Sequence, residues 1–371
     1  MSDLRVSILL LSGLFTYDLG DLLTIDPSCL HAEEPSSTAE SEWRLVQRLE
    51  TPQGFLRHIA FSSDGNWLVA ATARPDPEGD FHAPIQGAVI LIETEKPRIV
   101  RVFQSEEFGS PDAVAVTEDS SSVFALWDHG TVLCWKRQSG ELEKSLNGPE
   151  EAGHAVQVLD GGKIAAWSCN DGKTRIWSLP SQKEEAVLET GIFLHLALSP
   201  HAKRCALARK TIRTGESEFT IPIEERGSAV VWNVDRSTVE ATLTGHDKSI
   251  SSIAFSPDGS VIATGGQDGV VKLWQLPTGL PVLADFKAHS ESVMGLAFSP
   301  DGKLLATGGV FDPEAKVWNV GSGALATVLR WTDTDDPSSM VIPIAFSPGG
   351  KLLAVGAEEG VVAFWRVPPR K

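Results

Sequence analysis

The sequence predicts an all-β fold, a seven-bladed β-propeller with four antiparallel strands in each blade. Two observations carry this prediction. The motif Phe-Ser-Pro-Asp-Gly at 255–259 recurs at 298–302 and, as Phe-Ser-Pro-Gly-Gly, at 346–350. Tryptophans that end apolar strand patterns, such as Trp274, follow one another at intervals of 42 to 55 residues. A repeat of that length is typical of propellers and solenoids, and short strands between frequent turn signals indicate β-structure.

The fifth repeat shows the pattern most completely. Its turn at 256–259 contains a proline that presets φ and a final glycine that adopts the left-handed conformation needed to close a short hairpin. We expect four strands, at 253–255, 261–264, 270–274 and 281–286, with a second turn at 266–269. Weaker copies of the opening motif bring the number of repeats to seven, and they begin at Phe61, Val116, Val158 and Leu198.

The two ends of the propeller complement each other. The seventh repeat stops at Val367, one strand short, because the following Pro-Pro-Arg-Lys cannot form a fourth strand. Residues 43–49 resemble the fourth strands of other repeats. We therefore expect a ring closed by an N-terminal strand that completes the last blade and leaves no free sheet edge at the join. Residues 43–371 then form one propeller domain, since single blades cannot bury their faces alone.

Residues 1–42 precede the propeller and leave two alternatives open. The apolar run at 6–15, with Arg5 in front of it and Leu-His-Ala at 30–32, favours a signal peptide over 1–32 and an exported protein. Leu-His-Ala at 30–32 would be the cleavage site of such a signal peptide. Three aspartates between the apolar run and this site favour instead an N-terminal arm on a cytoplasmic protein. The run is too short to cross a bilayer, so no membrane span is expected. Residues 33–42 are interpreted as a linker in either case.

The repeats resemble those of the WD-repeat (WD40) family, strongly in the last three and more weakly in the first four. The resemblance implies a propeller of WD40 type whose blades are pinned by four hydrogen-bonded side chains. The fifth repeat matches all four, as His246, Thr264, Asp268 and Trp274. A buried indole N–H and a buried carboxylate both need partners. We therefore interpret this His-Asp-Thr set as structural and expect no catalytic site.

Other repeats match this tetrad less completely. The sixth keeps His289, Thr307 and Trp318, with Asp312 displaced by one inserted residue. In the third repeat, Trp167 stands at the serine or threonine position. These departures predict weaker pinning of individual blades, but they leave the fold prediction unchanged.

Charge and composition exclude several functions. A net charge of −17 and a pI near 5.0 argue against a nucleic-acid binder, which needs a basic surface, and favour a cationic partner. Neither a phosphate-binding glycine motif nor a Cys/His cluster stands in the sequence, so we expect no cofactor and no zinc site. The acidic segments 76–80 and 333–336 lack the ligand order of a calcium loop. Of the four cysteines, Cys169 is expected in a turn and accessible to solvent.

Loop lengths break the symmetry of the ring. Long segments separate second from third strands at 73–86 and 209–226, and join consecutive blades at 104–112 and 331–340. The resemblance implies that both loop classes emerge on one face of the disc, and loops held by a rigid scaffold concentrate binding residues. The candidate partner-binding residues are Asp76, Glu78, Asp80, Phe81, Arg209, Lys210, Arg213, Trp331, Asp333, Asp335 and Asp336.

The leading hypothesis is a non-catalytic, monomeric scaffold that binds a protein or peptide of cationic character on this face. The alternative is a ligand-binding or enzymatic propeller with a site at the mouth of the central channel. Such a site would need convergent polar residues on the first strands, which are instead apolar at 59–61, 196–198 and 296–298. His58 and His195 precede two of these strands, and we interpret both as packing residues.

Overall fold

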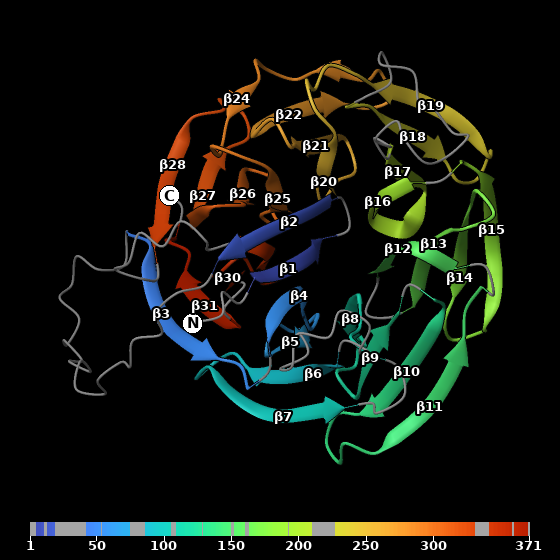
Figure 1. The fold of residues 1–371 in the computed structure, drawn as a ribbon, viewed down its shortest axis with the longest axis vertical. Coiled ribbons are helices and arrows are strands. Elements are labelled where there is room, and N and C mark those ends of the chain that lie inside the picture. The colour runs from blue at the N-terminus through green and yellow to red at the C-terminus, as the bar shows by residue number, and fades with distance from the viewer. Residues whose placement is uncertain are drawn as a thin grey trace.

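The strands close into a ring of seven sheets around a central axis (Figure 1). The computed structural model describes residues 5–10, 13–18, 42–52, 54–74, 86–104, 109–127, 129–149, 152–159, 163–191, 193–209, 227–330, 341–357 and 360–369. The predicted seven-bladed propeller is confirmed. Among the described residues, no helix has the length and apolar character needed to cross a membrane.

Each blade consists of antiparallel strands that follow one another outward from the axis. Blade one contains β4 (Phe55–Phe61), β5 (Trp67–Arg74), β6 (Gln86–Glu93) and β7 (Arg98–Gln104). Blade two contains β8 (Ala113–Val116), β9 (Ser122–Leu126), β10 (Thr131–Lys136) and β11 (Leu142–Asn147). Blade three contains β12 (Ala152–Leu159), β13 (Ile164–Cys169), β14 (Lys173–Ser178) and β15 (Lys183–Glu189).

The remaining blades repeat this order. Blade four contains β16 (Phe193–Leu198), the short 3-10 helix η2 (Pro200–Ala202), β17 (Arg204–Arg209), β18 (Ala229–Asn233) and β19 (Thr238–Leu243). Blade five contains β20 (Ile250–Phe255), β21 (Val261–Gly266), β22 (Val270–Gln275), β23 (Leu280–Pro281) and β24 (Phe286–Lys287). Blade six contains β25 (Val293–Phe298), β26 (Leu304–Gly309), β27 (Asp312–Asn319) and β28 (Leu325–Arg330). Blade seven contains β29 (Val341–Phe346), β30 (Leu352–Ala357), β31 (Val361–Arg366) and β3 (Arg44–Glu50).

The repeated sequence motif forms the turn between the first two strands of a blade. In blade five, Ser256 Oγ donates to Asp258 Oδ1 at 2.6 Å and accepts the Val261 N–H at 2.9 Å. Gly259 closes the turn at a φ of 69°, and Gly302 does so at the same angle in blade six. Glycine adopts this left-handed conformation without a steric cost. The motif therefore recurs because each blade needs the same tight turn.

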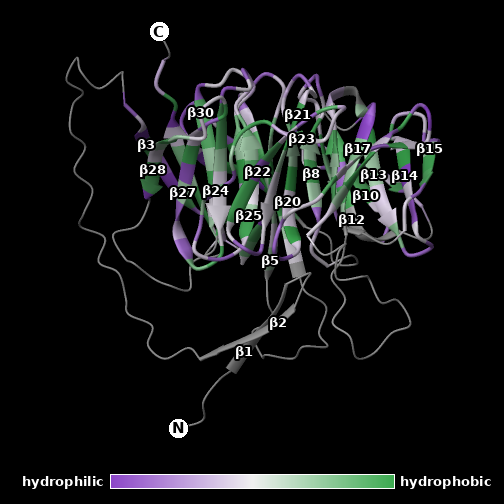
Figure 2. Ribbon diagram, turned by 90° about the horizontal axis from the view of Figure 1, so that it is seen from above, coloured by the Kyte–Doolittle hydropathy of each residue, from purple (hydrophilic) through white to green (hydrophobic). Residues whose placement is uncertain are grey.

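The hydrophobic core lies between the blades. The described residues form seven clusters of buried apolar side chains, and each cluster draws on two neighbouring blades. Between blades six and seven, for example, Val317 and Leu329 share a cluster with Val355 and Trp365. Figure 2 shows hydrophobic residues concentrated along the strands and hydrophilic ones toward the rims. An isolated blade would expose both of its faces, so the stability of each blade depends on its neighbours.

The ring is closed by strands from opposite ends of the propeller. β3 pairs antiparallel with β31, from Arg44↔Arg366 to Glu50↔Val361, as the outermost strand of blade seven. Leu45 of β3 packs against the core between blades six and seven. The predicted closing strand at the N-terminal end of the propeller is therefore confirmed.

The fourth strand of blade five differs from the prediction. We expected one strand over 281–286, whereas β23 and β24 are two short segments that pair with different parts of β22. Between them, Asp285 forms an ion pair with Lys272 of β22. Leu283 packs into the cluster that blades five and six share. The interruption in strand pairing thus falls at the residues that make these two contacts.

Residues 5–18 contain a further pair of strands. β1 (Arg5–Leu10) and β2 (Gly13–Asp18) pair antiparallel, with Leu10 opposite Gly13. The apolar run at 6–15 coincides with this hairpin. Most of residues 1–41 lie outside the described part of the chain, so the signal peptide over 1–32 and the linker over 33–42 stay predictions.

Removing residues 1–50 is expected to destabilise the whole propeller, because blade seven then loses its outer strand. We expect aggregation or a fall in Tm of roughly 10 °C or more, measured by thermal unfolding. Removing residues 1–41 alone is the matched control and should leave the Tm nearly unchanged. A monomeric 51–371 fragment with the Tm of the control would contradict the closure mechanism.

Candidate interaction face and its supporting side chains

Strand direction sorts the connections of the ring onto two faces. Because neighbouring strands run antiparallel, connections from second to third strands and from blade to blade leave at one rim, which we call the b–c/d–a face. Connections from first to second and from third to fourth strands leave at the opposite rim, the a–b/c–d face. Figure 2 views the disc from the side, with the strands running between the two rims. The strands that flank all four long segments end at the b–c/d–a face.

The two faces differ strongly in the charge of their connecting segments. Between the strand ends of the propeller, the b–c/d–a segments contain 22 aspartates and glutamates but only 4 lysines and arginines. The a–b/c–d segments contain 9 acidic and 7 basic residues. The imbalance on the first face is as large as the net charge of the entire chain, −17. The acidity of the connecting segments therefore belongs mainly to those whose flanking strands end at the b–c/d–a rim.

The predicted partner-binding residues belong to segments at this face. Their neighbours at the strand ends, Arg74 and Gln86 around one segment and Arg330 and Val341 around another, are described. Arg209 ends β17, and nothing further is described of its side chain. The others lie outside the described residues, and their role stays a prediction: Asp76, Glu78, Asp80, Phe81, Lys210, Arg213, Trp331, Asp333, Asp335 and Asp336.

Blade five brings its four predicted tetrad residues together. Trp274 Nε1 donates to Thr264 Oγ1 at 2.9 Å, and the same oxygen lies 2.9 Å from His246 Nε2. His246 Nδ1 lies 3.1 Å from Asp268 Oδ2, which also accepts the Asp247 N–H at 3.0 Å. His246 comes from the connection after blade four and Asp268 from the turn between β21 and β22. The tetrad thus ties a d–a connection to a b–c turn directly beneath the b–c/d–a face.

One arrangement of protons satisfies all four tetrad groups. An indole N–H can only donate, so Thr264 Oγ1 accepts from Trp274 and uses its own hydrogen to donate to His246 Nε2. His246 Nδ1 then carries the ring proton and donates it to the Asp268 carboxylate. Burial lowers the pKa of His246, and the neighbouring Asp268 charge opposes this shift only in part. The neutral imidazole that the arrangement requires is therefore the stable form.

Blade six contains an equivalent tetrad that includes Asp312. His289 Nδ1 lies 2.7 Å from Asp312 Oδ2, His289 Nε2 lies 2.8 Å from Thr307 Oγ1, and Trp318 Nε1 donates to Thr307 at 3.0 Å. The inserted residue does not remove the aspartate from the set, although the sequence analysis placed it out of position. The missed signal is the distance to the tryptophan, because the aspartate stands six positions before the tryptophan in repeats five and six alike.

A lysine supports the aspartate of blade six, and sequence reasoning missed it. Lys316 Nζ donates to Asp312 Oδ2 at 2.9 Å and to the Ala288 carbonyl at 3.1 Å. Glu314 lies 3.8 Å from Lys316 and also forms an ion pair with Arg330. The sequence offered one signal for this role: repeat five has a lysine, Lys272, at the same distance before its strand-end tryptophan as Lys316 in repeat six.

Glycines make room for the buried histidines. A Cβ atom on Gly266 would lie 2.2 Å from the Asp268 carboxylate and 2.5 Å from the His246 ring. A Cβ atom on Gly309 would lie 2.7 Å from His289. The close approach of backbone and imidazole therefore requires glycine at the end of the second strand in both blades.

Four other blades keep the tryptophan but lack the threonine, and three of these, blades three, four and seven, share a further feature. Their strand-end indole nitrogens are buried and have no hydrogen-bond partner among the described residues, as is the case for Trp177, Trp232 and Trp365. The position of Thr264 is taken in these blades by Trp167, Leu207 and Val355. In blade three, Trp167 donates to the Trp127 carbonyl at 3.1 Å and packs edge-on against Trp177. Pinning by the tetrad is thus a property of blades five and six.

Polar residues on the first strand of blade one bond to the neighbouring blade. Arg57 of β4 forms an ion pair with Asp112 and donates to Ser110 Oγ at 3.0 Å. His58 Nδ1 accepts the Val114 N–H at 3.3 Å, and burial lowers the pKa of His58 to about 4. These contacts join blades one and two, which agrees with the interpretation of His58 as a packing residue.

The cysteines include one correction. Cys169 is the last residue of β13, pairs with Ala152 and has no exposed surface, whereas we expected it in the accessible turn that follows. Cys134 and Cys205 are buried, and burial raises the pKa of Cys134 to about 11. In the part of the chain that the structure describes, no three potential metal ligands of the His, Cys, Asp or Glu type lie together.

Exchanging valine and threonine between two blades tests the role of the tetrad hydroxyl. Thr264→Val leaves the Trp274 N–H and His246 Nε2 buried without partners and should lower the free energy of unfolding by about 2–4 kcal/mol. Val355→Thr offers Trp365 Nε1 an acceptor and should raise it by about 1 kcal/mol. Denaturant unfolding measures both changes. If both exchanges changed the free energy of unfolding by the same amount in the same direction, the proposed role of the threonine hydroxyl would be contradicted.

Stability should also fall with acidification from pH 7 to pH 4. Burial lowers the pKa of His58 and of His195 to about 4, whereas an unfolded histidine titrates near 6.5. The unfolded chain therefore binds protons first, and each histidine contributes a loss of up to roughly 3 kcal/mol in this window. His195→Leu should flatten the decline, measured by denaturant unfolding at each pH. The exposed His129, changed to Asn, is the control, and an unaltered slope in the His195 variant would contradict the assignment.

Comparisons with known proteins agree with this architecture. The family model "WD domain, G-beta repeat" matches residues 237–275 and 281–319, which hold the two complete tetrads. Transducin beta-like protein 3 of Bos taurus is 25% identical over 252 residues, 62% of this chain and 28% of the relative. Apoptotic protease-activating factor 1 of Homo sapiens is 26% identical over 201 residues, 52% of this chain and 14% of the relative.

A shorter match is closer in sequence. The small ribosomal subunit protein RACK1y of Oryza sativa subsp. japonica is 42% identical over 52 residues, 14% of this chain and 16% of the relative. The matched part of this chain thus spans less than a third of the length of these curated relatives. The seven-bladed fold, the tetrads and these repeat matches together support placing the chain in the WD40-repeat family of β-propellers.

Proposed function

We propose that this protein is a non-catalytic platform that binds a basic protein or peptide on its b–c/d–a face. The observation that carries the proposal is the charge difference between the two sets of connecting segments: those that join strand ends at the b–c/d–a rim contain 22 acidic and 4 basic residues, and those at the opposite rim contain 9 and 7. Such a difference orients a cationic partner toward one face and speeds its association. WD40 propellers typically serve as protein-interaction scaffolds, which agrees with this function.

The tetrads support the proposal because they hold the connections of this face in place. His246 and His289 lie in connections between blades and bond to Asp268 and Asp312 in the second-to-third strand turns. The imidazole rings are shielded from solvent, so these bonds are protected from competing water. A binding surface built on fixed connections loses less conformational entropy when a partner docks.

The polar groups near the axis favour a platform over the alternative, a catalytic site at the channel mouth. Arg57 is engaged by Asp112 and Ser110, and His58 by a backbone N–H of the next blade. These contacts occupy side chains that a channel site would need to turn toward a ligand. The relative named as a small ribosomal subunit protein is part of a larger assembly by that name, and a role within an assembly is consistent with our proposal.

Neutralising acids on one face should weaken binding, whereas the same change on the other face should not. Asp333, Asp335 and Asp336, each replaced by Asn, remove three charges from a b–c/d–a segment. The matched control, Glu95→Gln, Glu141→Gln and Asp235→Asn, removes three from a–b/c–d segments. Quantitative pull-downs from native lysate at low and high salt should show basic partners reduced severalfold only with the first variant, most strongly at low salt.

Two outcomes would contradict the proposal. Equal losses with both variants would mean that overall charge, rather than one face, attracts the partners. An unchanged set of bound proteins with the first variant would mean that the acidic segment is only a solvated surface.

A further inference from the structure

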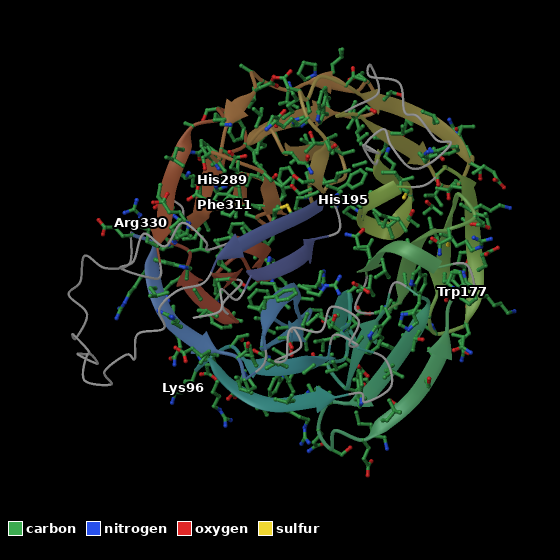
Figure 3. All side chains as sticks on the ribbon, in the orientation of Figure 1. Lys96, Trp177, His195, His289, Phe311 and Arg330 are labelled. Carbon is green, nitrogen blue, oxygen red and sulfur yellow. The ribbon has the colours of Figure 1, made fainter. Side chains whose placement is uncertain are left out.

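The seam between blades two and three contains a cleft at the a–b/c–d face. Its volume is about 570 Å³, within the range of roughly 300–1,000 Å³ that is typical of small-molecule sites. The apolar residues that line it are Phe124, Cys134, Leu146, Leu179 and Pro180. Leu146 and Leu179 belong to the hydrophobic cluster of this seam, against which Trp177, labelled in Figure 3, also packs. The cleft therefore opens onto the hydrophobic core between the two blades.

A serine at the start of the second strand distinguishes this seam from the others. Ser122 is the first residue of β9, and its partner on β10 is the residue that follows the strand-end Trp135. At the corresponding register position the other six blades have larger side chains: Trp67, Ile164, Arg204, Val261, Leu304 and Leu352. A hydroxymethyl group is too small to fill the space that these side chains occupy. The cleft thus coincides with the blade that has a small residue at this position.

The preceding seam shows which group fills this position in blade one. Trp67 packs against the hydrophobic cluster between blades one and two. Arg137, from the third-to-fourth-strand turn of blade two, covers it, with the Cζ atom 4.2 Å from the centre of the Trp67 ring. In blade three the corresponding residue is Leu179, since each is the second residue after a strand-end tryptophan. An indole ring therefore fits between neighbouring blades at this position, and Leu179 offers it an apolar surface.

A carboxylate beside the cleft is placed to accept a hydrogen bond from an indole. Glu143 Oε2 accepts a hydrogen bond from Ser122 Oγ at 3.2 Å and lies 3.9 Å from Cys134 Sγ. Ser122 and Cys134 are buried, whereas Glu143 is exposed. A carboxylate has about four lone-pair positions, so Glu143 can accept a further bond. Phe124, which is partly exposed, adds an aromatic contact. The cleft thus combines apolar walls with an acceptor, as an indole side chain requires.

Charge and exposure around the cleft favour a neutral side chain of a polypeptide. The charged residues that line the cleft are Glu118, Asp119, Glu143, Lys144 and Lys163. Three acids and two bases leave the charge nearly balanced, which favours a neutral group over an ion. β11 is the outermost strand of blade two, and its residues 142–145 are all exposed. A partner segment therefore has open surface beside the cleft, which favours a protein side chain over a free small molecule.

We propose that this cleft is a docking pocket for a tryptophan side chain of a partner polypeptide. The indole ring takes between blades two and three the place that Trp67 takes between blades one and two. Its N–H donates to Glu143, and its faces pack against Phe124 and Leu179. Tryptophan is enriched among the residues that dominate protein–protein binding. The pocket lies on the face opposite to the one proposed for the basic partner, so it constitutes a second and independent contact surface.

Peptides with and without tryptophan test this pocket. The probe is a capped pentapeptide with one tryptophan flanked by alanines, and the comparison peptide has leucine in its place. N-acetyl-tryptophanamide represents a free small molecule. Ligand-observed saturation-transfer NMR gives the affinity of each for the full-length protein. Ser122→Trp fills the cleft from within, and Glu143→Ala removes the acceptor. The matched controls are Ser145→Trp and Glu141→Ala, at exposed positions that do not line the cleft.

We expect the unaltered protein to bind the tryptophan peptide about fivefold more tightly than the leucine peptide, and more tightly than N-acetyl-tryptophanamide. Ser122→Trp should weaken binding of the tryptophan peptide about tenfold and raise the Tm by about 2 °C, because its own indole then packs into the cleft. Glu143→Ala should weaken binding about fivefold through the loss of one hydrogen bond. Both controls should retain the affinity of the unaltered protein.

Each contrary outcome overturns a stated part of the proposal. Equal affinities for the tryptophan and leucine peptides overturn the pocket, as does unchanged binding by a folded Ser122→Trp variant. N-acetyl-tryptophanamide that binds as tightly as the peptide overturns the assignment to a polypeptide. If Ser122→Trp does not fold, the exposed Glu143 position decides: Glu143→Ala with the affinity of Glu141→Ala overturns the pocket, and a loss of about fivefold supports it. None of these results depends on the basic partner of the opposite face.

Discussion

Burial of apolar surface between neighbouring blades is the interaction on which this structure depends. Every cluster of buried residues that the structure describes combines two blades, and the cluster between blades seven and one closes the series. Phe364 of blade seven and Leu56 of blade one illustrate this last contact. Both side chains are fully buried in one cluster, although they come from opposite ends of the propeller sequence. Because burial of one such side chain is worth about 1.5–3 kcal/mol, a single open interface would remove much of the marginal stability of a folded chain. The connections at either rim are positioned by this packing.

Polar anchoring is added to that packing unevenly around the ring. Blades five and six pair each buried indole N–H with a threonine, and the threonine with a buried histidine. Blade one avoids the problem, because Ala70 and Ile92 stand where those blades have threonine and tryptophan. Replacing both partners of a buried hydrogen bond by apolar groups is nearly neutral, whereas removing one partner is costly. Blades three, four and seven show neither arrangement. Each keeps a buried indole N–H that has no acceptor among the described residues.

The sequence was sufficient to predict the blades, because the turn motif and the strand-end tryptophan are local signals. The closing strand was also predictable, since the last repeat ends at Val367, where the pattern has three strands. Contacts that depend on side chains from different segments were harder to predict. Lys316 reaches Asp312 only because the inserted residue of repeat six lies before the aspartate, in the turn. Cys169 is buried because β13 includes it as its last residue, whereas the sequence pattern suggested that it lies in the following turn. The interrupted strand around Leu283 follows from packing against blade six.

Of the candidate face, the sequence identified the acidic segments but not their contrast with the opposite face. That contrast emerges only when strand ends assign each connection to a rim. Phe311 has a φ of 56°, in the left-handed region, and this conformation was equally inaccessible, because the letters Val-Phe do not reveal which residue adopts it. Glycine and asparagine are the usual markers of that conformation, and neither is present between Gly309 and Asp312.

The closing strand has a consequence for the order of events during synthesis. β3 is the first strand of the propeller to be made, yet its partner β31 is among the last, so the pair has the longest sequence separation in the ring. Contacts of this kind form slowly, and an unpaired strand is a template for aggregation while it waits. The outward positions of β3 are occupied by Arg44, Gln47 and Glu50. Charged and polar residues along an unpaired edge discourage pairing with other chains. The polar side of β3 thus protects the nascent chain until the last blade has been translated.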